Sequence, residues 1–157
     1  MAFERFTKEA RAAVAGATQE ATAESADGIV EAEHLLLALS RHPDIQALGL
    51  DHEELRAALH REEERSLAAV GVSAAEFDLG ASPGRRPRFS RWSGRPPLAT
   101  STKLALQRAL TSAVDRRDRT VTARHLLAGV IAAERGRVPR ALELAGIDVA
   151  NLRRRVP

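Results

Sequence analysis

Long runs rich in Ala, Leu, Val and Glu alternate along the chain with short polar or glycine-containing breaks, and each run predicts a helix. Residues 8–23 follow Thr7, a good N-cap residue, and are a nearly uninterrupted series of apolar residues, Glu and Gln. Residues 31–39 carry acids in the first turn and leucines after it, which favours a buried helix with a stabilised dipole. Asp44 can cap a short helix that ends at Leu48.

A recurring turn pattern marks where one helix ends and the next begins. Gly49 suits the left-handed residue just past a helix end, and Asp51 suits the cap of the following helix. The same order of residues recurs at Gly71, where Ser73 would be the cap, and at Gly146. We expect helices after the first and last of these turns, over residues 52–70 and 149–155.

The order of elements in the first part of the chain returns in the second. Residues 98–101 lead into a helix expected over residues 102–114, and residues 122–130 parallel residues 31–39. Three pairs of residues occupy equivalent places in the two copies: Phe6 and Leu98, His34 and His125, Gly49 and Gly146. The sequence therefore predicts an all-α fold of about eight helices, in which two pseudo-twofold repeats share one core.

A stretch of different composition separates the two copies. Residues 80–97 are rich in Gly, Ser, Pro and Arg, a composition typical of a linker or surface loop. We expect a single domain over residues 1–157, with repeat one at 1–79, the linker at 80–97 and repeat two at 98–157. The linker should be exposed and mobile, and trypsin should cut it first unless Trp92 anchors it to the helices.

Composition limits the kind of protein. Hydrophobic residues make up 44% of the chain but aromatic residues only 3%, so the core must consist of Ala, Leu, Val and Ile. The chain contains no cysteine, which excludes disulfides and cysteine-based zinc sites. No apolar run is long enough for a membrane span, and the N-terminus lacks the features of a secretory signal. We therefore expect a cytoplasmic protein that does not bind membranes.

Charge is distributed unevenly and leaves an alternative open. The net charge is +3, with an acidic balance over residues 1–79 and a strongly basic one over residues 80–157. Residues 85–95 interleave arginines with Phe89 and Trp92, a composition that can bind nucleic acid through phosphates and stacked bases. A solvated linker explains the same composition, and no helix-turn-helix or RNA-binding motif accompanies it. Nucleic-acid binding is kept as the alternative function.

The motifs that would indicate catalysis are incomplete. The segment His-Glu-Glu-Leu-Arg at residues 52–56 begins like a zinc-binding His-Glu-x-x-His motif but ends in arginine. The segment Gly-Val-Ser-Ala-Ala at residues 71–75 lacks the final glycine of a nucleophile elbow. Nothing matches the Gly-x4-Gly-Lys-Ser/Thr loop that binds nucleotide phosphates. We expect no enzyme activity, no ATP binding, no metal, no cofactor and no catalytic residue.

Two motifs carry a family resemblance. Residues 3–7 (Phe-Glu-Arg-Phe-Thr) open the first expected helix, and residues 32–39 (Ala-Glu-His-Leu-Leu-Leu-Ala-Leu) form the second. Their order, spacing and duplication resemble the N-terminal domain of Clp-type AAA+ unfoldases over nearly the whole chain. That family has a double helical repeat, and each copy has a Phe-Thr opening and a Thr-Glu-His-Ile-Leu-Leu-Gly-Leu helix.

The chain departs from the family pattern at several positions. Ala32 and Ala123 stand where the family has Thr, and Arg124 stands where the second copy has Glu. The second Phe-Thr opening is replaced by Leu98 and Ala99. The linker between the copies is longer than in the family, and the loop after the first His helix is shorter. We expect a divergent, stand-alone relative without the ATPase module.

The resemblance implies a non-catalytic module that binds a protein or peptide. It would act as an adaptor, decoy or sequestering protein in Clp-dependent proteolysis, with Clp protease components as further partners. Relatives bind phosphoarginine or cyclic-peptide antibiotics, which makes these candidate ligands. The family's groove runs between the repeats near the starts of their first helices. The matching positions here are Phe3, Thr7, Arg11, Glu33, Leu98, Lys103 and Arg124.

The two copies differ at the position that the resemblance links to phosphoarginine. In some members the Glu of each Glu-His pair faces the guanidinium group of that ligand. Glu33 keeps this place in the first copy, whereas Arg124 takes it in the second and would repel a guanidinium. Backbone N–H groups after Thr7 could bind the phosphate. Any phosphoarginine binding should therefore use one site, formed by Glu33 and the helix start at Thr7, with no equal second site.

Overall fold

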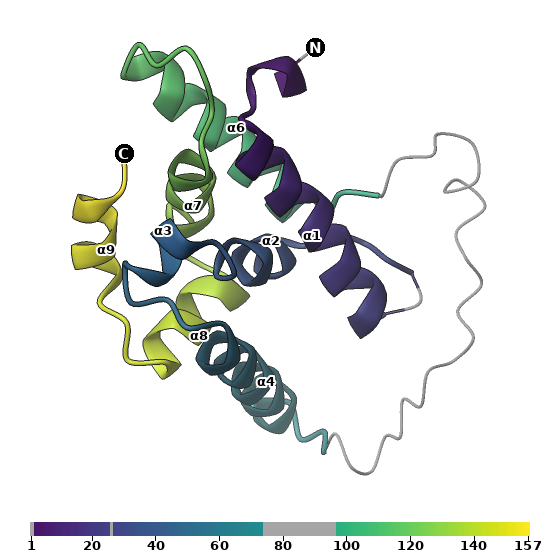
Figure 1. Cartoon of the computed structure of the whole chain (residues 1–157). Helices are drawn as coiled ribbons and strands as arrows, with labels where there is room; N and C mark the ends of the chain where they lie inside the picture. Colours follow the sequence, from purple (N-terminus) through teal and green to yellow (C-terminus); the bar gives the residue numbers. More distant parts are fainter. Residues whose placement is uncertain (1, 26, 74–96) are drawn as a thin grey trace.

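The computed structural model describes residues 2–25, 27–73 and 97–157, and these residues form eight α-helices and one 3-10 turn (Figure 1). The first repeat contains η1 (Ala2–Arg5), α1 (Lys8–Glu24), α2 (Ala32–Leu39), α3 (Pro43–Gln46) and α4 (His52–Ala69). The second repeat contains α6 (Thr100–Asp115), α7 (Ala123–Ile131), α8 (Arg137–Leu144) and α9 (Val149–Arg155). The expected all-α fold is confirmed. The residues after Ser73 and the expected linker as far as residue 96, with Phe89 and Trp92, lie outside the described residues.

Capping residues set most helix ends where the sequence predicts them. The Thr7 hydroxyl accepts a hydrogen bond from the Ala10 N–H at 3.2 Å, which fixes the start of α1. The Asp51 carboxylate accepts one from the Glu54 N–H at 2.9 Å and starts α4. Gly49 has a φ of 90°, in the left-handed region that the turn after α3 requires.

The structure differs from the prediction at the start of α3, at the start of α6 and over the whole of α8. The cap of α3 is His42, whose Nδ1 accepts from the Asp44 N–H at 3.3 Å, so the expected cap at Asp44 is wrong. Proline suits the first turn of a helix, and Pro43 places that turn one residue before Asp44. The helix α6 begins two residues earlier than expected, after Ala99, and α8 was not expected.

The second helix of each repeat lies at the centre of the molecule. Every residue of α2 is buried, and α7 is nearly as deeply buried. The helix α1 packs on α2, α6 packs on α7, and α2 contacts α7 directly (Figure 1). The core is aliphatic, as the composition predicts, and its largest fully buried side chains are Val30, Leu35, Leu36, Leu39, Ile45, Leu50, Leu55, Val121, Leu126, Leu127, Ile131 and Leu142.

The two repeats are interlocked. The helix α4 of the first repeat packs against α8 of the second, and the two lie side by side in Figure 1. At the C-terminal end of α9, the Arg155 guanidinium donates to the Leu48 carbonyl of the first repeat at 3.2 Å. Each repeat therefore covers part of the core of the other.

Candidate ligand-binding site

Two short parallel bridges join the repeats where their helices begin. In the first junction, Phe6 pairs with Val121: the Thr7 N–H donates to the Val121 carbonyl at 3.0 Å, and the Val121 N–H donates to the Arg5 carbonyl at 2.8 Å. In the second junction, Val30 pairs with Leu98 through the same two kinds of hydrogen bond. Each junction joins the segment before the first helix of one repeat to the segment before the second helix of the other repeat. This arrangement supports the predicted correspondence of Phe6 with Leu98.

This exchange corrects the predicted pairing of site residues. The start of α1 at Thr7 lies beside the second repeat, next to the start of α7, which carries Arg124. Glu33 lies beyond the opposite end of α1, where Glu24 contacts His34. The 17 residues of α1 separate the two ends by roughly 25 Å. Thr7 and Glu33 therefore do not form one site, and the expected pairing within the first copy is wrong.

Polar side chains from α6 fix the start of α2 at the second junction. The Ser101 hydroxyl donates to the Glu31 carboxylate at 2.7 Å and accepts from the Ala32 N–H at 3.1 Å. The Thr102 hydroxyl donates to the Val30 carbonyl at 2.5 Å. Neither hydroxyl is among the site residues that the sequence predicts. Their place at a helix start, three to four residues after the second opening motif, is the only sequence signal that could have indicated them.

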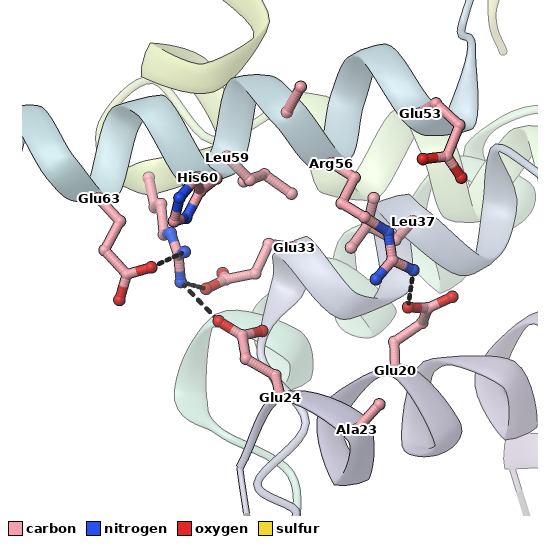
Figure 2. Close-up of a pocket in the computed structure, with 12 residues that line it drawn as sticks. Glu20, Ala23, Glu24, Glu33, Leu37, Glu53, Arg56, Leu59, His60 and Glu63 are labelled. Carbon is pink, nitrogen blue, oxygen red and sulfur yellow. Dashed lines mark hydrogen bonds and ion pairs between the residues drawn. The ribbon is translucent and has the colours of Figure 1, made fainter. Parts of the chain in front are cut away.

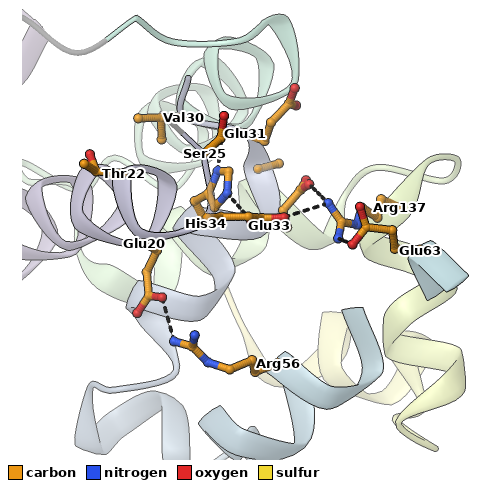
Figure 3. Close-up of polar contacts among 12 residues, drawn as sticks. Glu20, Thr22, Ser25, Val30, Glu31, Glu33, His34, Arg56, Glu63 and Arg137 are labelled. Carbon is orange, nitrogen blue, oxygen red and sulfur yellow. Dashed lines mark hydrogen bonds and ion pairs between the residues drawn. The ribbon is translucent and has the colours of Figure 1, made fainter. Parts of the chain in front are cut away.

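The two equivalent histidines stabilise the same turn in both repeats. His34 Nδ1 accepts from the Glu31 N–H at 2.9 Å, and its Nε2 contacts the Glu24 carboxylate at 2.5 Å (Figure 3). His125 Nδ1 accepts from the Thr122 N–H at 3.1 Å, and its Nε2 contacts the Asp118 carboxylate at 3.0 Å. The hydrogen bond from His34, opposed by burial, lowers the pKa of Glu24 below its ordinary value. Both histidines are buried and structural.

Glu33 already binds a guanidinium group, that of Arg137. Arg137 Nη1 lies 2.8 Å from the Glu33 carboxylate, and its Nη2 lies 3.3 Å from Glu63 (Figure 3). Arg137 Nη1 also lies 3.4 Å from Glu24. Burial of Arg137 lowers its pKa, but the attraction of Glu33, Glu24 and Glu63 outweighs this effect and raises the pKa above its ordinary value. The first residue of α8 is thus held by carboxylates from α1, α2 and α4.

Arg137 lies between two grooves. The acidic groove, about 480 Å³ in volume, lies between α1, α2 and α4, and five glutamates line it: Glu20, Glu24, Glu33, Glu53 and Glu63 (Figure 2). Most of these carboxylates have partners within the chain, because Arg137 binds three of them and Glu20 contacts Arg41 and Arg56, each at 2.7 Å. The acidic groove is therefore largely neutralised by the protein itself.

The second groove, called here the α6–α8 groove, lies at the second junction and is larger, about 900 Å³. It is bounded by the starts of α2 and α6, the loop after α7 and the first turn of α8. Leu104 lies in this groove with 42% of its surface exposed. The other apolar lining residues are Ala32, Ala105, Val130, Ala132, Ala133, Val138 and Pro139.

The seven predicted site residues do not gather at one place. Glu33 lines both grooves, and Leu98 is half-buried at the second junction, with Lys103 exposed on the following turn of α6. The remaining four lie near the first junction, in η1, at the start of α1 or at the start of α7: Phe3, Thr7, Arg11 and Arg124. Phe3 stacks against Phe6 with ring centres 5.0 Å apart. The structure thus divides the predicted site between two junctions.

Comparison with known proteins identifies the fold. The model of the family described as Clp repeat (R) N-terminal domain matches residues 98–157. The structure superposes on the crystal structure of the N-terminal domain of the caseinolytic protease associated chaperone ClpD from Arabidopsis thaliana with a TM-score of 0.68. The two are 23% identical, and the match covers 98% of this chain and 93% of that one. The chain therefore has the fold of a Clp N-terminal domain, and its second repeat matches the sequence model of that family. No curated protein sequence matches the chain.

The family model matches only the second repeat, although the fold match covers both repeats. Within the described ranges, no helix has the length and apolar composition needed to cross a bilayer. In the same residues, no three metal-ligating side chains lie close enough together to hold an ion.

Proposed function

We propose that this Clp N-terminal domain is a non-catalytic module that binds a protein segment in the α6–α8 groove. The observation that supports this proposal most is Leu104, which is 42% exposed in a groove where half of the lining residues are apolar. Grooves of this kind bind peptides by burying apolar side chains, while polar groups at the rim set orientation. Elements of both repeats line the groove, so its shape depends on the complete double repeat.

Narrower roles belong to the same proposal. Binding of a protein segment would suit an adaptor, decoy or sequestering protein in Clp-dependent proteolysis, and a cyclic peptide is a ligand of comparable size. Phosphoarginine is a weaker candidate, because Glu33 is bound to Arg137 and lies far from the helix start at Thr7. A ligand guanidinium would have to displace Arg137 from a buried ion pair.

The test uses a permanently unfolded carrier protein as a probe for segment binding. We expect the purified chain to bind this probe. Leu104→Glu should weaken the binding about tenfold or more, because a ligand in the groove would then have to remove water from a carboxylate. The matched control is Val114→Glu, which changes an apolar residue of the same helix that is 54% exposed and lies outside the groove lining. Equal effects of the two substitutions would refute the groove as the binding site.

A further inference from the structure

The helices α4 and α8 form a pair that is set apart from the other helices. They pack more extensively on each other than on the central helices α2 and α7, although α4 belongs to the first repeat and α8 to the second. Figure 1 shows the pair toward the lower edge of the view, with α1 and α6 above it. We call this pair, residues 52–69 and 137–144, the α4–α8 unit.

Apolar packing holds α4 mainly at its N-terminal part. Leu55 and Leu59 are buried there, whereas over residues 60–69 the one buried side chain is that of Glu62, a charged residue. At the first residue of α4, His52 Nδ1 lies 3.0 Å from the Leu37 carbonyl oxygen of α2. The start of α4 is therefore fixed to the core, while its C-terminal part depends mainly on polar contacts.

Two arginines of the α4–α8 unit form ion pairs with the first two helices. Arg137, at the start of α8, lies 2.8 Å from Glu33 of α2 and 3.4 Å from Glu24 of α1. Arg56 of α4 lies 2.7 Å from Glu20 of α1. Glu20 and Glu33 are buried, and a buried carboxylate needs a cationic partner. These ion pairs therefore hold the unit against α1 and α2.

This closed position leaves one polar atom unsatisfied. Arg137 Nε is buried and has no hydrogen-bond partner among the described residues, and the Glu62 carboxylate lies 3.6 Å from it. A buried donor without an acceptor costs free energy, which offsets part of what the ion pairs of Arg137 contribute. Water could reach this N–H if the unit moved away from α1 and α2, so opening the unit would remove that cost.

Glycines with a positive φ lie where the chain enters and leaves the unit. Gly49 comes three residues before α4, Gly136 directly precedes α8, and Gly146 follows α8, with φ values of 90°, 114° and 72°. No described atom outside the adjacent residues lies within 4 Å of a Cβ built at any of the three, so these turns have room to change. Residues at the ends of elements can absorb the backbone rotation that a moving element requires.

Both grooves lie at the boundary between the unit and the rest of the molecule. The acidic groove, about 480 Å³, lies between α4 and the first two helices. The α6–α8 groove, about 900 Å³, lies between the start of α8 and the starts of α2 and α6. Arg137 lines both grooves. A movement of the unit away from α1 and α2 would therefore widen both.

From these contacts we infer that the α4–α8 unit is a hinged flap that opens the two grooves together, and that the ion pairs of Arg56 and Arg137 hold it closed. The N-terminal part of α4 is the pivot, because its apolar packing stays in place. The inference goes beyond the proposed function, since it does not depend on what either groove binds.

The test measures two distances in the full chain by double electron–electron resonance. The chain contains no cysteine, so nitroxide labels can be attached to pairs of introduced cysteines. Ala15→Cys with Ala68→Cys places labels at exposed positions of α1 and α4, across the boundary. Ala68→Cys with Glu143→Cys places both labels at exposed positions within the unit.

The arginine variants should open the flap. Arg56→Met combined with Arg137→Met should lengthen the mean distance between α1 and α4 by more than about 2 Å and leave the distance within the unit unchanged, with helix content retained by circular dichroism. Arg56→Met alone leaves Glu20 its ion pair with Arg41, so it should fold even if the double variant does not, and it should shift part of the distribution in the same direction. If neither variant lengthened the distance between α1 and α4, the inference would fail.

Arg65→Met is the matched control. Arg65 is an exposed arginine of α4 that lines a pocket with Arg140 of α8, within the unit, and its loss should change neither distance. Equal lengthening in Arg65→Met would show that the ion pairs with α1 and α2 are not what holds the flap. If the distance within the unit also lengthened in the other variants, α4 would be leaving α8, and the idea of a single moving unit would be wrong.

Discussion

His34 and His125 occupy the third position of the second helix in their repeats and accept a hydrogen bond from the backbone where that helix begins. Each also contacts a carboxylate from the end of the preceding helix or its loop, Glu24 or Asp118. The acceptor role of Nδ1 leaves Nε2 as the nitrogen that donates. One side chain thus joins two helices, which explains why histidine appears at the same place in both copies.

At the residue scale we predict a defined pH dependence of stability from Glu24. Its pKa in the folded protein lies below the ordinary value of 4.5, so the carboxylate stabilises the fold above that pH. This stabilisation is lost as the pH falls through the lowered pKa. The difference in unfolding free energy between the natural chain and Glu24→Gln should therefore shrink on acidification below 4.5, as measured by urea unfolding. A difference that stayed constant with pH would contradict the prediction.

At the scale of elements, the sequence predicted most helices because their caps and glycine turns are local signals. The start of α4 at Asp51 and the turn at Gly49 depend on residues next to each other. The helix α8 escaped prediction because Gly136 offers no side-chain cap and Pro139 resembles a helix breaker. Proline is tolerated in the first turn, where its missing N–H has no helical partner, so the helix can form once α4 packs against it.

The contact of α6 with α7 depends on a glycine. A Cβ added to Gly129 would lie 2.1 Å from the Ala105 carbonyl oxygen, so the backbones could not approach this closely with any other residue. We predict that Gly129→Ala destabilises the protein by about 1–3 kcal/mol, although alanine favours an isolated helix by about 1 kcal/mol. Chemical denaturation of the two chains would measure the difference.

The first repeat supplies the matched control at Gly16 in α1. A Cβ there would lie 3.3 Å from the Ala38 Cβ, a contact that a shift of a few tenths of an ångström relieves. Gly16→Ala should therefore change the unfolding free energy by less than about 1 kcal/mol, because helix propensity offsets the tighter contact. A loss at Gly16 as large as that at Gly129 would show that helix packing tolerates no added carbon in either repeat.

At the scale of the whole molecule, the sequence showed which residues correspond but not which copy each one contacts. Correspondence between Phe6 and Leu98 follows from the repeated pattern, and it holds equally for repeats that lie side by side and for repeats that exchange segments. In both bridges a segment of one repeat pairs with a segment of the other. Thr7 therefore lies beside the second repeat and far from Glu33. The ion pair of Glu33 with Arg137 was unpredictable for the same reason, since 104 residues separate the two.

Arg137 is predicted to hold the repeats together. Arg137→Met leaves the buried Glu33 carboxylate without its guanidinium and should cost about 3 kcal/mol of unfolding free energy. Adding Glu33→Gln should restore part of the loss, because the uncompensated charge is removed. Arg135→Met, which removes an exposed arginine two residues away, should change stability by less than about 0.5 kcal/mol. Lack of recovery in the double variant would show that Glu33 does not depend on Arg137.

Each junction takes one segment from each repeat, and this has a consequence for how the two copies could diverge. In a symmetric homodimer of identical repeats, a single substitution would alter both junctions together. In a fused duplicate, a substitution in one copy alters only one junction and leaves the other intact. Glu33 and Arg124 hold equivalent places, yet one faces the second junction and the other the first, with opposite charge. A chain with two such repeats therefore has two junctions whose chemistry can change separately.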